Sequence, residues 1–371
     1  MAVEGQSGQV ENSAGMRSDL LVIQYLRGIA AVGVLGFHAC QRSGLDFGMG
    51  AAGVDIFFVI SGFIMWVVSA GKARGPGDFL LRRAGRIAPL YWTVTLGVVG
   101  LDLLRPSLFP NMLLTAPHVV LSLLFLPHQD PHGAVAPVIV PGWTLSYEVF
   151  FYLVFALTLF LPLARRAWAL TAIMAALCLA GAATQGGGPV WTTFTNPLVL
   201  EFVAGVWLAK AWTSGRLGGP AAGWTAVAAG CGLLLAAAVS GAEVSGAARL
   251  YLWGLPAVLI VWGGLCLERA GRVARLPPLK LLGDASYSIY LVHGLALSLV
   301  FKLLGTRPGL PPALLLACAV PFAALLGIGC YFGLERPLLA VFHPGRRKAA
   351  AQASPAKQTL SLRKPSEAFR V

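Results

Sequence analysis

Arg27 and His38 carry side chains that could do chemistry, yet both lie inside the apolar stretch YLRGIAAVGVLGFHACQ. In an α-helix this spacing is about three turns, so both side chains share one face, about 16 Å apart along the axis. A charged residue inside a membrane helix is costly and by default marks a functional site. The pair is therefore a candidate site, provided that the stretch spans a membrane.

Further polar residues interrupt later apolar stretches. Asp55 and Ser61 lie in GVDIFFVISGF, and Trp143 and Glu148 lie in PGWTLSYEVFFYL. A carboxylate beside a histidine can fix its tautomer and stabilise the imidazolium, as in a catalytic dyad. Asp55, Glu148 and His38 are therefore the candidate catalytic residues.

Two other stretches also carry several polar groups. In FLLRRAGRIAPLYW, Arg83 and Arg86 are three residues apart, with Arg82 beside them. Guanidinium groups suit phosphate oxygens in number and geometry. In LGDASYSIYLVH, Tyr287 and His293 could support the site or contact a substrate.

The composition indicates an integral membrane protein. Of 371 residues, 57% are hydrophobic and 12% are charged, whereas about a quarter of the residues of a soluble domain are charged. The six cysteines are scattered, which excludes a disulfide framework and zinc-binding spacing. Apolar runs predict an all-α polytopic protein of about ten spans. They are residues 19–40, 51–70, 87–104, 142–163, 167–184, 194–212, 221–240, 250–267, 284–304 and 311–334.

The positive-inside rule sets the expected orientation. The run 112–127 is short and interrupted by Pro117 and His118, so we expect 105–141 to be a partly buried excursion on the outer side. With both termini cytoplasmic, most lysines and arginines lie inside. The outer loops then hold Arg42, Arg105, Arg249 and Arg307.

Three regions follow from this reading: a polar N-terminal segment 1–18, a transmembrane domain 19–340 and a basic, disordered cytoplasmic tail 341–371. The net charge of +13 then reflects topology and attraction to anionic lipids. No nucleic-acid-binding module accompanies it, so we expect no nucleic acid as a partner.

Six segments in order, YLRGIAAVGVLGFH, GVDIFFVISGF, FLLRRAGRIAPLYW, WTLSYEVFFYL, SYSIYLVH and ERP, closely resemble the membrane acyltransferase-3 family. The best-matching branch is similar to exopolysaccharide O-acetyltransferases, and the resemblance covers about residues 20–340. It implies transfer of an acyl group, usually acetyl, from cytoplasmic acyl-CoA to a hydroxyl, here on a polysaccharide or lipid-linked oligosaccharide. The implied location is the inner membrane.

The resemblance also carries residue roles. The family's arginine–histidine motif falls on Arg27 and His38, and its paired-arginine motif falls on Arg83 and Arg86. We expect Arg27, Arg82, Arg83 and Arg86 to bind the acyl-CoA donor. Its acidic residue falls on Asp55. Its tryptophan and glutamate fall on Trp143 and Glu148. The pattern needs no metal and no permanently bound cofactor, since acetyl-CoA is a substrate.

Several alternatives stay open. His38 could act as a general base or carry the acyl group covalently. His38 and His293 could also be interhelical hydrogen-bonding residues, and the arginines could be topology signals. The acceptor could be a small lipophilic molecule such as a macrolide sugar. A transporter would explain an intramembrane histidine, but not the arginine cluster at the inner entrance.

The predicted topology can be tested by labelling single introduced cysteines from each side of the membrane. We expect residues 72–86 to be labelled from the cytoplasm and residues 127–141 from outside. Outside labelling at 72–78 would contradict the orientation and place His38 near the inner face.

Overall fold

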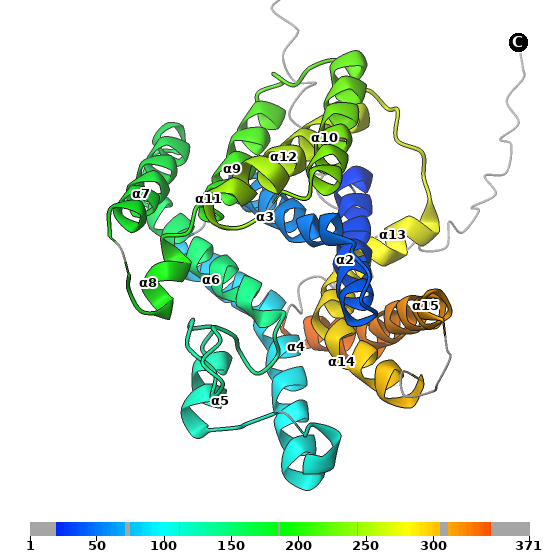
Figure 1. The fold of residues 1–371 in the computed structure, drawn as a ribbon. Helices are drawn as coiled ribbons and strands as arrows, with labels where there is room; N and C mark the ends of the chain where they lie inside the picture. The colour runs from blue at the N-terminus through cyan, green and yellow to red at the C-terminus, as the bar shows by residue number, and fades with distance from the viewer. Residues whose placement is uncertain are drawn as a thin grey trace, which may run out of the picture.

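The computed structural model describes residues 20–70, 75–110, 112–184, 186–242, 244–304 and 311–342, and these ranges form helices and no β-strand (Figure 1). The long helices are α2 (Leu21–Arg42), α3 (Gly53–Ala70), α4 (Pro76–Leu104), α7 (Leu163–Ala183), α10 (Pro220–Ser240), α14 (Ser286–Leu304) and α15 (Pro312–Cys330). The shorter elements are η1 (Gly48–Ala52), η2 (Pro106–Leu108), α5 (Ala116–Leu123), α6 (Gly142–Thr158), α8 (Pro189–Phe194), α9 (Val199–Thr213) and α13 (Pro277–Asp284).

Two long helices are composite. α12 (Leu255–Arg269) is preceded without a break by α11 (Gly246–Arg249) and a π-helical turn, η3 (Leu250–Gly254). α15 continues through a second π-helical turn, η4 (Tyr331–Glu335), into α16 (Arg336–Phe342). π-turns are frequent at functional sites. η3 directly follows Arg249, and η4 ends at Glu335. Both charged residues belong to the site described below.

The all-α polytopic fold predicted from the sequence is confirmed. Within the described residues, 8 helices are long and apolar enough to cross a membrane. Two of the ten predicted spans, 142–163 and 194–212, correspond to the shorter helices α6 (17 residues) and α9 (15 residues). α6 ends at Thr158, before Pro162, and the Asn196–Pro197 step separates α8 from α9, so neither helix reaches its predicted length.

The run 112–127 forms α5, which has 8 residues and is too short to cross a bilayer. The connection between α4 and α6 is therefore an excursion, as the sequence predicts. The predicted segment 1–18, and the predicted tail beyond Phe342, lie outside the described residues.

Small residues bring α3 and α9 into backbone contact. A Cβ atom on Gly62 would lie 1.9 Å from the carbonyl oxygen of Phe202, and one on Gly205 would lie 2.0 Å from that of Val59. Neither position accepts a side chain without moving the backbone. Such close approach is typical of helix pairs in membranes, where packing rather than hydrophobic burial holds helices together.

α13 packs beside the first turns of α2. A Cβ on Gly283 would lie 2.1 Å from the Gln24 carbonyl oxygen. The Tyr25 hydroxyl donates to the Ala274 carbonyl at 2.9 Å and accepts from the Leu276 amide at 2.7 Å. α14, which follows directly, therefore begins about two turns along α2, and this brings the middle of α14 level with the end of α2.

Glu268, near the end of α12, caps the start of α2. Its two oxygens accept hydrogen bonds from the amides of Leu21 (3.2 Å) and Val22 (2.6 Å). A carboxylate is favourable at a helix N-terminus, because it meets unpaired amides and the positive end of the helix dipole. The contact places the start of α2 beside the end of α12, which agrees with the predicted alternation of spans.

Two histidines form a buried pair in the excursion between α4 and α6. The His118 Nδ1 lies 2.8 Å from the His128 Nε2. The His128 Nδ1 lies 2.8 Å from the Leu126 carbonyl and must donate to it, so the Nε2 of His128 accepts from His118. Burial lowers the pKa of His118, the neighbouring His128 lowers it further, and Asp130 opposes them.

We expect the excursion to loosen in acid. Because the pKa of folded His118 lies below its ordinary value of about 6.5, the stability that the neutral pair contributes is complete above that pH. It is lost as the pH falls from there toward the lowered folded value. Hydrogen exchange of peptides covering 116–138, corrected for intrinsic rates, should accelerate between pH 7.5 and 5.

A His118→Gln variant is the matched control, because a glutamine amide can still donate to His128 but does not titrate. Its exchange should depend less on pH than that of the original chain. Equal acceleration in both proteins would show that the histidine pair does not hold the excursion.

Candidate active site

His38 and His293 face each other across α2 and α14. Their ring centroids are 5.1 Å apart with an interplanar angle of 25°, so the two imidazoles stack. His293 is buried, whereas His38 is half-buried and also packs on Phe37, with centroids 4.8 Å apart. The sequence proposed both histidines, and the structure brings them together.

The tautomer of neutral His293 follows from one contact. Its Nδ1 lies 2.5 Å from the backbone carbonyl of Tyr290, which only accepts hydrogen bonds. Nδ1 therefore carries the proton, and the lone pair of the neutral ring is on Nε2. The histidine pair thus includes one ring, His293, whose tautomer and orientation are fixed.

Tyr290 connects the histidine pair with α3 and α6. Its ring centroid lies 5.8 Å from that of His293 and 5.6 Å from that of Phe57. Its hydroxyl interacts with the side chain of Thr144, near the start of α6. The site is therefore built from four helices rather than from the arginine–histidine helix alone.

Glu148 is held by two hydroxyl groups. Its Oε1 accepts from Ser61 on α3 at 3.0 Å and from the hydroxyl of Tyr152, one turn further along α6. Neither contact involves His38. Glu148 therefore orders the α3–α6 packing in this structure, and its predicted role as the direct partner of His38 stays a prediction.

Arg86 pairs with Glu335, the glutamate of the ERP segment, to which the sequence alone assigns no role. Its Nη1 lies 2.7 Å from Oε1 of Glu335, and the other oxygen of Glu335 accepts from Ser288 at 2.6 Å. The Arg86 guanidinium also lies over the Tyr287 ring, 5.9 Å from its centroid. Tyr287 in turn donates to the Ile87 carbonyl at 2.7 Å.

Arg27 joins the same cluster electrostatically. It interacts with Arg86, and with the carboxylates of Glu335 and Glu148. We call Arg27, Arg86, Ser288 and Glu335 the arginine–glutamate cluster. It links α2, α4, α14 and η4.

The other two predicted donor-binding arginines lie on α4 before Arg86. Arg82 is exposed and pairs with Asp78, both oxygens being 3.0 Å from its Nε. The Arg83 guanidinium lies 6.0 Å from the Phe79 centroid and interacts with the Tyr152 hydroxyl. Arg82 is therefore more available to a solvent-borne anion than Arg86, and Arg83 is half-buried beside it.

Asp55 is fully buried and forms a two-point ion pair with Arg249. The two nitrogen–oxygen distances are 3.1 and 2.9 Å. Glu201, also buried, lies beside this pair and interacts with Asp55. We call Asp55, Glu201 and Arg249 the aspartate–arginine cluster.

Two tryptophans lie around the guanidinium of this cluster. The Trp143 and Trp253 centroids are 5.9 and 4.9 Å from the Arg249 Cζ. Trp143 also contacts Phe58 and Tyr147 edge-on. Trp143 and Asp55 thus meet through Arg249, which the sequence analysis counted only as a charge of an outer loop.

Three residues of the site were missed from the sequence although signals were present. Glu201 interrupts the apolar run LVLEFVAGVW, in the same way that Arg27 interrupts its own stretch. Glu335 lies in the quoted ERP segment, and Arg249 directly precedes an apolar run. Glu335 is 249 residues from Arg86, and Arg249 is 194 residues from Asp55, so spacing alone does not reveal the pairs.

The Arg86–Glu335 pair should behave as a buried ion pair. Removing one partner leaves the other uncompensated and typically costs about 3–5 kcal/mol, whereas replacing both with apolar residues is often neutral. We expect Glu335→Leu and Arg86→Leu each to lower the melting temperature of the detergent-solubilised protein, and the double variant to recover much of the loss. Additive losses would show that the two side chains do not interact.

A family model described as "Acyltransferase domain", for acyltransferase family 3, matches residues 20–332. The exopolysaccharide production protein ExoZ of Rhizobium meliloti (strain 1021) is 44% identical over 313 residues, which are 82% of this chain and 94% of that protein. No solved structure matches the chain.

Two further relatives are more distant. The acyltransferase MdmB of Streptomyces mycarofaciens is 29% identical over 343 residues, covering 82% of this chain and 84% of that protein. Protein 2 in the picA locus of Rhizobium radiobacter is 31% identical over 156 residues, which are 37% of this chain and 80% of that protein. From the family match and the similarity to ExoZ, the chain belongs to the acyltransferase-3 family of membrane acyltransferases.

Proposed function

We propose that the chain is a membrane O-acyltransferase that moves an acetyl group from cytoplasmic acetyl-CoA to a hydroxyl of an exopolysaccharide or its lipid-linked precursor. The observation that carries this proposal is the stacking of His38, which shares α2 with Arg27, against His293 on α14. The similarity to a protein named for exopolysaccharide production supports the acceptor class. The proposed location is the inner membrane, with both termini cytoplasmic and no resident cofactor.

The proposed donor site begins at Arg82 and Arg83. The exposed Arg82–Asp78 pair contributes little and can exchange its carboxylate for a phosphate, because exposed ion pairs contribute about 0–1 kcal/mol. Arg86 is already neutralised by Glu335. We therefore assign phosphate binding to Arg82 and Arg83, and assign Arg27 and Arg86 to the wall along which the pantetheine arm reaches the histidines.

The proposed reaction needs a base for the acceptor hydroxyl. His38 takes the hydroxyl proton, the oxygen attacks the thioester carbonyl, and the carbon–sulfur bond breaks. The proton then passes to the sulfur of the departing CoA, so no net proton is released. The unperturbed pKa of a histidine side chain lies near neutrality, which suits a group that first takes up a proton and then gives it away.

The neighbours of His38 act by position in this proposal. His293 holds the His38 ring by stacking, with its own tautomer fixed by Tyr290. Glu148 fixes the hydroxyls of Ser61 and Tyr152. Asp55 holds Arg249 against Trp143, which would form part of the acceptor side of the site.

We expect His38→Gln to be as inactive as His38→Ala. Glutamine keeps hydrogen-bonding capacity but cannot take up a proton at neutral pH, and loss of a general base typically costs about 10²- to 10⁴-fold. The measurement is transfer of radiolabelled acetyl from acetyl-CoA to de-O-acetylated exopolysaccharide by purified protein. Binding of acetyl-CoA, measured separately, should remain largely intact.

The matched control is His132→Gln, at an exposed histidine of the excursion between α4 and α6, which should retain full activity. A correctly folded His38→Gln protein with near-normal transfer would rule out His38 as the base. The histidine pair would then have only a structural role in helix packing.

A further inference from the structure

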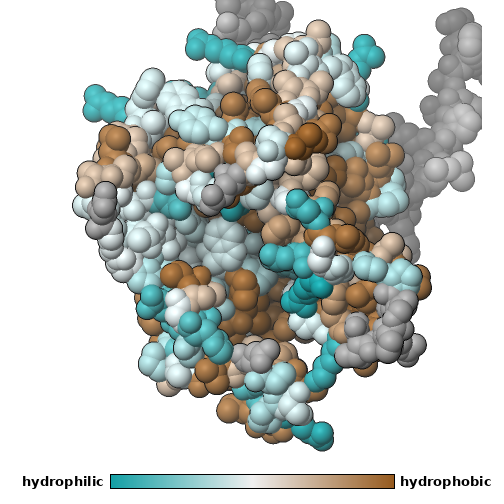
Figure 2. All heavy atoms as spheres, viewed as in Figure 1, coloured by the Kyte–Doolittle hydropathy of each residue, from teal (hydrophilic) through white to brown (hydrophobic). Residues whose placement is uncertain are grey.

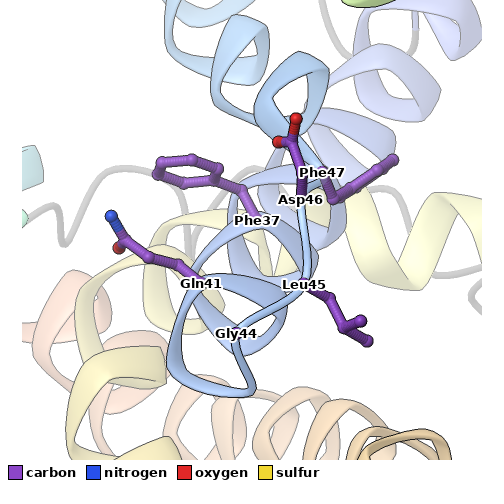
Figure 3. A pocket seen from close by; sticks show the side chains of 6 residues that line it. All are labelled: Phe37, Gln41, Gly44, Leu45, Asp46 and Phe47. Carbon is purple, nitrogen blue, oxygen red and sulfur yellow. The ribbon is translucent and has the colours of Figure 1, made fainter.

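A pocket lies directly beyond His38, where α2 ends. It has a volume of about 310 Å³ and is lined by Phe37, Gln41, Gly44, Leu45, Asp46 and Phe47. Figure 3 shows Phe37 and Gln41 projecting from α2, with Asp46 and Phe47 on the segment that leads away from the helix. Figure 2 shows hydrophilic side chains gathered in this part of the visible face.

The pocket adjoins the reacting group. Phe37 packs on the His38 ring, and the Gln41 side chain interacts with the same ring. Gln41 is three residues beyond His38, which is about 4.5 Å along the helix axis. A molecule bound here would therefore lie within one helical turn of His38.

The lining combines the two kinds of group that recognise a sugar. Phe37 and Phe47 supply aromatic surface for the apolar face of a pyranose ring. Gln41 supplies both a donor and an acceptor, and Asp46 supplies acceptors only, which suits ring hydroxyls that donate. Gln41, Asp46 and Phe47 are exposed, so a ligand can reach them.

The size and charge of the pocket limit the ligand further. Ligand pockets range from about 300 to 1,000 Å³, so this one holds a single sugar residue rather than an oligosaccharide. The Asp46 carboxylate disfavours a second negative charge. The nearby Arg42 forms no ion pair with Asp46 among the described contacts, because its guanidinium donates to Ser298 on α14 at 2.9 Å.

We propose that this pocket binds the neutral sugar residue whose hydroxyl is acylated, and that Asp46 and Phe47 determine acceptor specificity. The inference rests on the proposed function, since it requires that His38 accept a proton from a sugar hydroxyl. Beyond that function, the inference names the residues that select the acceptor and predicts that acidic sugars are excluded.

Asp46→Asn is the sharpest variant, because it removes the charge but can keep the local turn. The Asp46 Oδ1 accepts from the Gly48 amide at 2.8 Å, and an asparagine oxygen can do the same. Phe47→Ala is the second variant, and it removes the aromatic wall. Asp102→Asn is the matched control, a carboxylate on α4 outside the pocket.

The test measures the acceptor KM with de-O-acetylated exopolysaccharide fragments and the acetyl-CoA KM at saturating acceptor. Loss of a hydrogen bond to a charged group predicts an acceptor KM raised about tenfold in Asp46→Asn. Phe47→Ala should raise it similarly, whereas Asp102→Asn should not. The acetyl-CoA KM should stay unchanged in all three.

Competition tests the charge selection. Methyl β-glucopyranoside should inhibit the original protein more strongly than methyl β-glucuronide, and Asp46→Asn should narrow the difference. An active original protein whose Asp46→Asn and Phe47→Ala variants keep the acceptor KM would overturn the pocket assignment alone. No transfer from acetyl-CoA by the original protein would overturn the proposed function and the pocket assignment together.

Discussion

A charge that enters the hydrocarbon region must find its partner inside the helix bundle, and the Arg86–Glu335–Ser288 contact meets this constraint. It joins α4, α14 and the π-turn η4 at one point. The ion pair adds little net stability. Any arrangement that separates Arg86 from Glu335, however, leaves a buried charge unpaired and is strongly destabilised. The contact therefore fixes the depths of α4, α14 and η4 relative to one another, and with them the depth of His293 on α14.

The aspartate–arginine cluster imposes a second constraint at the other end of the site. Asp55 on α3 and Arg249 on α11 are tied by two hydrogen bonds, with Glu201 on α9 beside them. Tyr290 interacts electrostatically with Arg249 and Glu148, and its ring neighbours His293. The histidine pair therefore stands between two charge clusters, and neither supplies a carboxylate that contacts His38 directly among the described contacts.

The sequence predicted the apolar helices and the shared face of Arg27 and His38, because periodicity and hydropathy are local properties. It could not give the pairings. Arg249 looked like a loop charge, yet burial of Asp55 requires a cation, and only the folded chain shows which one. The lengths of α6 and α9 were overestimated, because apolar composition continues past Thr158 and begins before Val199, where proline-containing turns interrupt the helices.

The stacked histidines also limit the proton chemistry of the site. Two imidazoles whose centroids are 5.1 Å apart repel each other strongly if both are protonated, so the pair holds at most one positive charge. Burial of His293 disfavours a charge on its ring, whereas His38 is half-buried and interacts with Gln41 at the pocket. The added proton therefore belongs on His38, the ring that a substrate can reach. Neutral His293 keeps that ring in place without competing for the proton.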